Sequence, residues 1–221
     1  MWWDTFLLFT LYLAACTVFF IFFNKLSKSV KLIGYAVLAG FLINLSAVCL
    51  IYIFNFKNNL FLFHLLTLLQ YLLFSMSYFY HLNNFNIRKF ILISVPFFVI
   101  SSIILSLFVE PLNEYNSYSV SLSNLLIGFI TLFYFIEIFL KPNIKRIEFE
   151  PMFWISSGLL FVSFGNFLVQ GFMNYLIKNA GDYALQVYWI HEFLNFLFLI
   201  TFIIGIMSQY VNVSNNGFET L

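Results

Sequence analysis

Seven long apolar stretches dominate this sequence of 221 residues and constrain its fold more than any other feature. They cover approximately residues 3–23, 33–54, 60–80, 90–109, 119–140, 153–176 and 184–207. An α-helix rises about 1.5 Å per residue, so about 20 residues cross the roughly 30 Å of hydrocarbon in a bilayer. A membrane β-barrel would instead alternate polar and apolar residues in segments of about 10. The sequence therefore predicts an all-α, polytopic membrane helix bundle with seven transmembrane helices, in a single transmembrane domain over residues 1–221.

The scarcity of charge points to lipid as the surrounding solvent. Charged residues make up 9% of the chain and hydrophobic residues 62%. Soluble domains carry about 25% charged residues, so a water-exposed surface cannot be covered here, and the expected partner is the lipid bilayer. The formal net charge is +1 and no basic face is present, which excludes a nucleic-acid partner.

The basic residues between the stretches predict the orientation of the chain. Eight of the ten Lys and Arg lie in alternate connections, at Lys25, Lys28, Lys31, Arg88, Lys89, Lys141, Lys145 and Arg146. The other connections hold only Lys57 and Lys178. Because cytoplasmic connections are enriched in Lys and Arg, we expect the N-terminus outside and the C-terminus inside, which requires an odd number of spans.

Polar residues inside three of the stretches suggest a site. The sixth stretch carries Asn166 and Gln170 on one helical face, and the seventh carries His191, Glu192 and Asn195. His64, Gln170 and His191 share a depth, roughly 9 Å outward of the helix centres at 1.5 Å per residue. We therefore expect a polar pocket in the outer half of the membrane. Its candidate binding residues are His64, Gln70, Asn166, Gln170, His191, Glu192 and Asn195.

A purely structural role is the alternative for these residues. Amide and hydroxyl side chains often join helices, with about 0.6 kcal/mol per hydrogen bond on average. Glu192 is less easily explained in this way, because a carboxylate inside the membrane costs roughly 2.5–3.5 kcal/mol on insertion scales. Glu137 in the fifth stretch lies one turn before Lys141, and we expect the two to pair.

Several functional classes fail on missing residues. A retinal protein needs a Lys in the seventh span, and none follows Lys178. His81 is expected on the opposite side from His64 and His191, so too few ligands converge for a metal. No metal site and no cofactor are therefore predicted, and an enzyme is the less favoured class. A sensory or accessory module with a separate signalling partner remains the first hypothesis. The alternative is an intramembrane enzyme or cofactor-binding protein that uses His64, His191 and Glu192.

Three segments carry a resemblance to a known family. They are residues 63–70 (FHLLTLLQ), residues 151–158 (PMFWISSG) followed by residues 164–166 (FGN), and residues 190–195 (IHEFLN). These segments resemble small, uncharacterised seven-span bacterial membrane proteins, which are similar to the membrane regions preceding some histidine kinases. That family often has Glu where this chain has Gln70. The resemblance implies a multi-pass protein of the bacterial cytoplasmic membrane with a part in signalling, and it supplies neither a ligand nor a catalytic residue.

Overall fold

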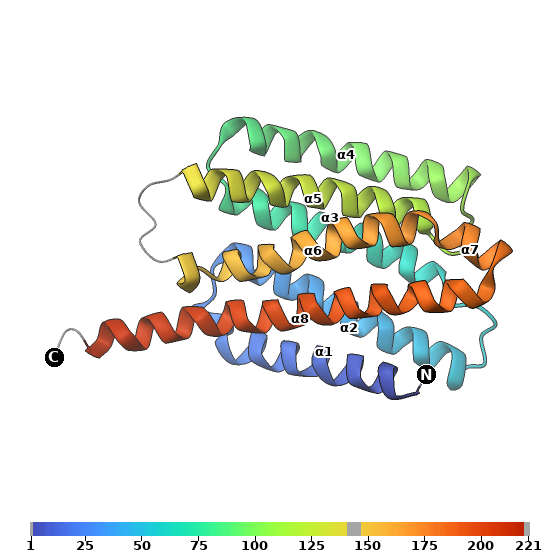
Figure 1. Cartoon of the computed structure of the whole chain (residues 1–221), viewed down its shortest axis with the longest axis horizontal. Coiled ribbons are helices and arrows are strands. Elements are labelled where there is room, and N and C mark those ends of the chain that lie inside the picture. Colours follow the sequence, from blue (N-terminus) through green and yellow to red (C-terminus); the bar gives the residue numbers. More distant parts are fainter. Residues whose placement is uncertain (1, 141–146, 219–221) are drawn as a thin grey trace.

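The chain folds into a bundle of long helices that run approximately along one direction (Figure 1). This computed structural model describes residues 2–140 and 147–218, with side chains for residues 6–140 and 147–208. Over that part of the chain the secondary structure is helical and contains no strand. The helices are α1 (Trp2–Phe22), α2 (Lys28–Tyr52), α3 (Phe61–His81), α4 (Phe85–Phe108), α5 (Ser117–Leu140), α6 (Pro151–Gly171), α7 (Met173–Asn179) and α8 (Gly181–Phe218). Short 3₁₀ helices at Phe23–Lys25 and Ile147–Phe149 complete the set.

The predicted architecture is confirmed. Within the described residues, seven helical segments are long and apolar enough to cross a membrane, and the chain is a multi-pass helical membrane protein. Some helix ends differ from the prediction. Ser27 accepts a hydrogen bond from Val30 N at 3.4 Å, so α2 begins at Lys28, well before residue 33. The sixth stretch is interrupted at Phe172, and its last residues form the short α7.

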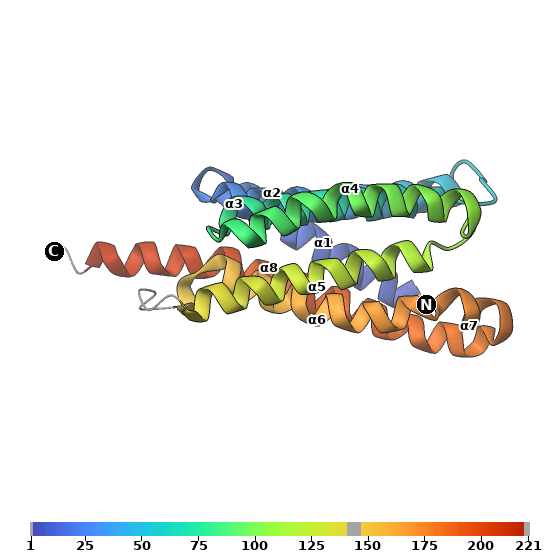
Figure 2. The same ribbon diagram turned by 90° about the horizontal axis from the view of Figure 1, so that it is seen from above.

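The helices form two layers with α1 at one edge between them (Figure 2). One layer contains α2, α3 and α4, and the other contains α5, α6 and α8. Helix α1 packs on α2 and α8, while α5 packs on α3 and α4. Helices α1, α2, α3, α5, α6 and α8 therefore form a ring, and α4 lies outside it with exposed apolar side chains such as Ile93, Phe97 and Ile100.

The bundle has two ends that differ in their connections. Figure 1 places the beginning of α1, α7 and the α4–α5 connection at one end, which we call the Glu110 end. The distribution of basic residues predicts that this end faces outward. The other end, which we call the Glu137 end, holds the connections from α1 to α2 and from α3 to α4. Helix α8 continues beyond the rest of the bundle there (Figure 1).

Glycines in α6 allow a close approach to α8, as small residues commonly do at contacts between membrane helices. A β-carbon on Gly158 would overlap Thr201 Oγ1, and one on Gly165 would lie 2.5 Å from Leu194 Cδ1. Neither site has room for a side chain without movement of its neighbour. The two glycines therefore set the spacing of α6 and α8, the two helices that carry most of the candidate site residues.

Candidate functional site

A cavity of about 320 Å³ lies inside the ring of helices at the Glu110 end. We call it the main cavity. Its wall is formed by Leu8, Tyr12, Asn44, Leu60, Phe63, Leu66, Thr67, Gln70, Tyr115, Asn116, Val120, Gln170, Tyr188, His191, Glu192 and Asn195. A smaller cavity of about 100 Å³ adjoins it, because Tyr12, Gln70 and His191 are among the residues that line both. The space thus extends from the connections at the Glu110 end into the interior of the bundle.

The structure brings six of the seven candidate residues to this space. The main cavity is lined by Gln70, Gln170, His191, Glu192 and Asn195. Asn166 lines the smaller cavity. These residues come from α3, α6 and α8, the helices that correspond to the three polar stretches of the sequence.

His64 is placed elsewhere, on the side of α3 that faces α4. Its Nε2 donates to Glu114 O at 3.2 Å, so its Nδ1 accepts from Ser106 Oγ at 3.1 Å. Gln70 follows it by six residues, which at about 100° per residue points the two side chains roughly 120° apart. A shared depth therefore does not bring His64 to the cavity that Gln70 lines.

His191 lies between two amide side chains. Its Nδ1 is 3.0 Å from Asn166 Oδ1, and its Nε2 is 3.0 Å from Asn195 Nδ2. With the amides oriented in this way, Nδ1–H donates to Asn166 and Nε2 accepts from Asn195, as in a neutral imidazole. Both ring nitrogens are thus engaged. In the part of the chain that the structure describes, no three His, Cys, Asp or Glu side chains are grouped to hold a metal ion.

Gln170 offers an unused hydrogen-bond donor in the cavity wall. Tyr115 OH donates to Gln170 Oε1 at 2.6 Å, which fixes the amide group. Gln170 is fully buried, and its Nε2 has no hydrogen-bond partner. A buried polar group without a partner costs roughly 1–3 kcal/mol. An acceptor bound in the main cavity would remove that cost.

Three tyrosines share the cavity with Glu192. Tyr12, Tyr115 and Tyr188 come from α1, the α4–α5 connection and α8, and all line the same wall. Glu192 follows Gly181 by 11 residues, roughly 16 Å along α8 at 1.5 Å per residue. Of the described residues lining the main cavity, Glu192 is the single carboxylate, and none is Lys or Arg. An ionised Glu192 therefore makes this space negative.

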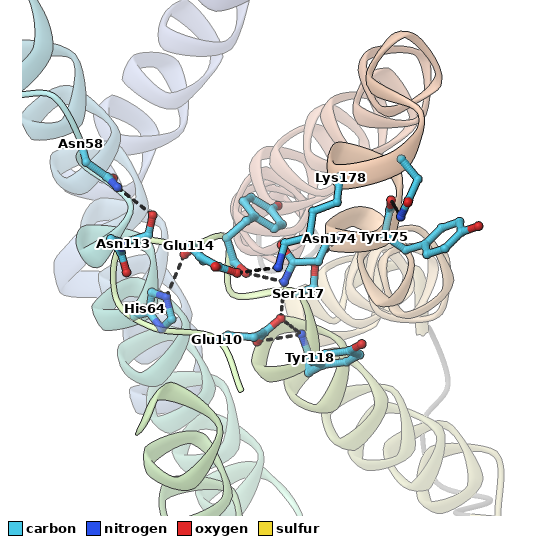
Figure 3. Close-up of polar contacts among 12 residues, drawn as sticks. Asn58, His64, Glu110, Asn113, Glu114, Ser117, Tyr118, Asn174, Tyr175 and Lys178 are labelled. Carbon is cyan, nitrogen blue, oxygen red and sulfur yellow. Dashed lines mark hydrogen bonds and ion pairs between the residues drawn. The ribbon is translucent and has the colours of Figure 1, made fainter. Parts of the chain in front are cut away.

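The α4–α5 connection, residues 109–116, holds Tyr115 and Asn116 in place. We call it the bridging connection, because it bonds to both layers of the bundle (Figure 3). On the α3 side, His64 donates to Glu114 O, and Asn58 Nδ2 donates to Asn113 O at 2.7 Å. On the other side, Lys178 Nζ lies 2.9 Å from Glu114 Oε2. The bridging connection thus joins the two layers beside the main cavity, whose wall includes its residues Tyr115 and Asn116.

Glu110 anchors this connection to α5 and α7. Its carboxylate accepts from Tyr118 N at 2.9 Å and from Asn174 Nδ2 at 2.6 Å, as Figure 3 shows. Asn174 Nδ2 also donates to Tyr115 O at 2.8 Å. Glu110 is only 1% exposed, and burial raises the pKa of its carboxyl group, although the hydrogen bonds from Tyr118, Ser119 and Asn174 act in the opposite direction.

Several cavity residues were not identified from the sequence. They are Tyr12, Asn44, Tyr115 and Asn116. Tyr12 and Asn44 are isolated in apolar helices, and the other two lie in a connection, so none belongs to a polar stripe. Tyr188 was not among the candidate residues either, although its position one helical turn before Glu192 indicates that the two side chains lie on one face of α8.

Glu137 makes contacts that the sequence did not indicate, and its expected pairing with Lys141 stays a prediction. Its carboxylate accepts from Asn83 N at 3.1 Å and Asn84 N at 3.3 Å, at the beginning of α4. Lys141, the expected partner, lies outside the described residues. Glu137 thus joins α5 to the α3–α4 connection at the end of the bundle remote from the main cavity.

Comparison of the chain with protein-family models, curated proteins and solved structures finds no match in any of the three. The features of the chain that bear on its function are therefore the cavity and the residues that line it.

Proposed function

We propose that this chain is a sensory or accessory membrane module that binds a small molecule in the main cavity. The observation that carries the proposal is the buried Gln170 Nε2, a donor without a partner in the wall of an internal polar cavity. Ligand sites combine mostly apolar walls with a few placed polar groups. Here Leu8, Phe63 and Leu66 supply apolar surface beside the polar residues.

The position of the cavity between two layers supports a role in signalling. A ligand there contacts α3 of one layer and α6 and α8 of the other. Ligand binding shifts a conformational equilibrium only if the ligand binds one state more tightly than the other. A ligand held by both layers favours the state in which the two layers are close enough to contact it together. The bridging connection joins the same layers, so its opening and ligand release are coupled in this proposal.

Helix α8 provides a route for the output. It carries His191, Glu192 and Asn195 and runs without interruption for 38 residues. That is roughly 57 Å at 1.5 Å per residue, about twice the hydrocarbon thickness. A shift of α8 at the cavity would move its far end, where we place contact with a separate signalling partner. The resemblance to membrane regions preceding some histidine kinases motivates this assignment and the bacterial cytoplasmic membrane as its location.

The intramembrane-enzyme alternative has less support from the geometry. It requires His64, His191 and Glu192 to converge, and His64 lies outside the cavity that the other two line. His191 also has both ring nitrogens bonded to Asn side chains. No observation at this site favours a particular reaction.

Thermal unfolding of the purified protein in lipid nanodiscs tests the proposal. Small amines, alcohols, sugars and carboxylates would be added singly to the wild type and to Val120→Phe, which fills space shared by both cavities. A ligand at 100 times its Kd stabilises by about 2.7 kcal/mol, so the wild type should gain several degrees and the variant little. Hydrogen exchange in residues 109–116 should slow with the same compound. Equal effects on both proteins, or none, would reject a ligand site in the main cavity.

A further inference from the structure

We infer that the main cavity selects a small organic cation, with an ammonium group beside Glu192 and an apolar body against the opposite wall. The inference rests on the proposed function, because it names the class of ligand for the same site. Glu192 is the single carboxylate among the described lining residues, which include no Lys or Arg.

The depth of Glu192 strengthens the charge argument. Interactions between opposite charges grow as the local dielectric falls, and Glu192 lies well inside an apolar helix, 11 residues from Gly181 at its beginning. His191 is the single histidine among the described lining residues, and its hydrogen bonds with Asn166 and Asn195 are those of a neutral imidazole. Among the described lining residues, an anionic ligand would therefore meet a like charge, whereas an ammonium would meet the opposite charge.

Three tyrosines also favour a cation in the main cavity. Aromatic faces attract cations through the ring quadrupole, most strongly where water is excluded. Tyr12, Tyr115 and Tyr188 line the cavity together with Glu192, and Tyr12 is only 9% exposed. Tyr188 is 42% exposed, so it forms the part of the wall nearest to the surroundings. An ammonium can thus lie against aromatic rings as well as beside the carboxylate.

The remaining lining specifies the rest of the ligand. Leu8, Leu60, Phe63, Leu66 and Val120 form apolar surface in the same cavity. The cavity measures about 320 Å³, whereas an engineered cavity of roughly 150 Å³ holds benzene. The free Gln170 Nε2 requires an acceptor. The geometry therefore fits an ammonium with an aromatic or aliphatic body and a hydroxyl or carbonyl oxygen.

Three compounds of one shape test the inference. Tyramine, tyrosol and 4-hydroxyphenylacetate share a phenol ring and carry an ammonium, a hydroxyl and a carboxylate respectively. Their affinities would be measured by isothermal titration on the full chain in nanodiscs. The wild type should bind tyramine at least tenfold more tightly than tyrosol, and 4-hydroxyphenylacetate most weakly. Glu192→Gln should bind tyramine and tyrosol with about equal affinity, and its affinity for tyrosol should equal that of the wild type.

Matched variants separate the local charge from other effects. Asp182→Asn removes a negative charge from an exposed position on the same helix, outside the cavity, and should keep the tenfold preference. Tyr188→Leu should lower the preference for tyramine over tyrosol about threefold. This variant tests the inference independently if Glu192→Gln does not fold. Gln170→Leu should weaken tyramine and tyrosol by the same factor.

The outcomes distinguish this inference from the proposed function. If tyrosol or 4-hydroxyphenylacetate binds as tightly as tyramine, or if only neutral or anionic compounds stabilise the wild type over Val120→Phe, the cation inference is overturned and a ligand site remains. A tyramine preference that survives Glu192→Gln also overturns it. If no compound of any charge distinguishes the wild type from Val120→Phe, both proposals fail.

Discussion

Replacement of Gly158 by Ala should disturb the bundle at the contact that positions the candidate site. A methyl group there would overlap Thr201 Oγ1, lie 3.0 Å from Thr201 Cβ and lie 3.4 Å from Phe198 Cα. Thr201 Oγ1 donates to Phe198 O at 2.9 Å, so rotation of Thr201 away from the methyl would break that hydrogen bond. Thr201 Cβ stays in place when the side chain rotates, so its 3.0 Å contact with the methyl group would remain. The two helices must therefore separate slightly.

The size of the effect follows from three contributions. Overpacking in a filled interior costs about 1–3 kcal/mol, and loss of the Thr201 hydrogen bond costs roughly 0.5–1.5 kcal/mol. Alanine returns about 1 kcal/mol of helix propensity relative to glycine. We therefore expect Gly158→Ala to lower the free energy of unfolding by about 1–3 kcal/mol. Asn166 lies on the same helix, so its 3.0 Å contact with His191 should also lengthen and ligand affinity should fall.

Unfolding in mixed micelles with increasing SDS, followed by circular dichroism, measures this change. Gly181→Ala is the matched control, because a β-carbon there has no neighbour within 4 Å. It should alter stability by less than about 0.5 kcal/mol, as most exposed substitutions do. The double variant Gly158→Ala/Thr201→Ala removes the overlapping oxygen and should recover most of the loss. If Gly158→Ala is as stable as Gly181→Ala, or Thr201→Ala brings no recovery, the close contact of α6 and α8 is not as described.

Three further predictions concern the Glu110 end. Burial raises the pKa of Glu110 in the folded protein above its ordinary value of 4.5. The contribution of Glu110 to stability is therefore present below pH 4.5 and is lost as the pH rises through the raised pKa. Glu110→Gln should remove this part of the pH dependence of unfolding, and an unchanged pH profile would contradict the prediction. Asn174→Ala should lower stability by roughly 1–3 kcal/mol, because it removes donors to the buried Glu110 carboxylate and to Tyr115 O; a neutral result would refute the anchoring role. Lys178→Ala should cost only about 0–1 kcal/mol, an effect that disappears at high salt, because the Lys178 and Glu114 side chains are 62% and 38% exposed.

The sequence alone determined the helical architecture, because the signals that encode it are local. Runs of apolar residues as long as a bilayer is thick define the spans, and their scarcity of charge defines the solvent. The positions of Asn166 and Gln170 on one face of α6 also follow from helical periodicity. Six of the seven residues selected from the sequence line the two cavities, and their role in binding stays a prediction.

Only the tertiary structure decided which helix faces which neighbour. The orientation of α3 turned His64 toward α4 and Gln70 toward the cavity, although both lie in one apolar stretch. Tyr12 and Tyr115 became cavity residues because α1 and the bridging connection pack beside α8 and α6, over long separations in the chain. The rotation of a helix about its axis depends on the close contacts it makes, such as that of Gly158 with Thr201, and a single-helix pattern does not contain those contacts.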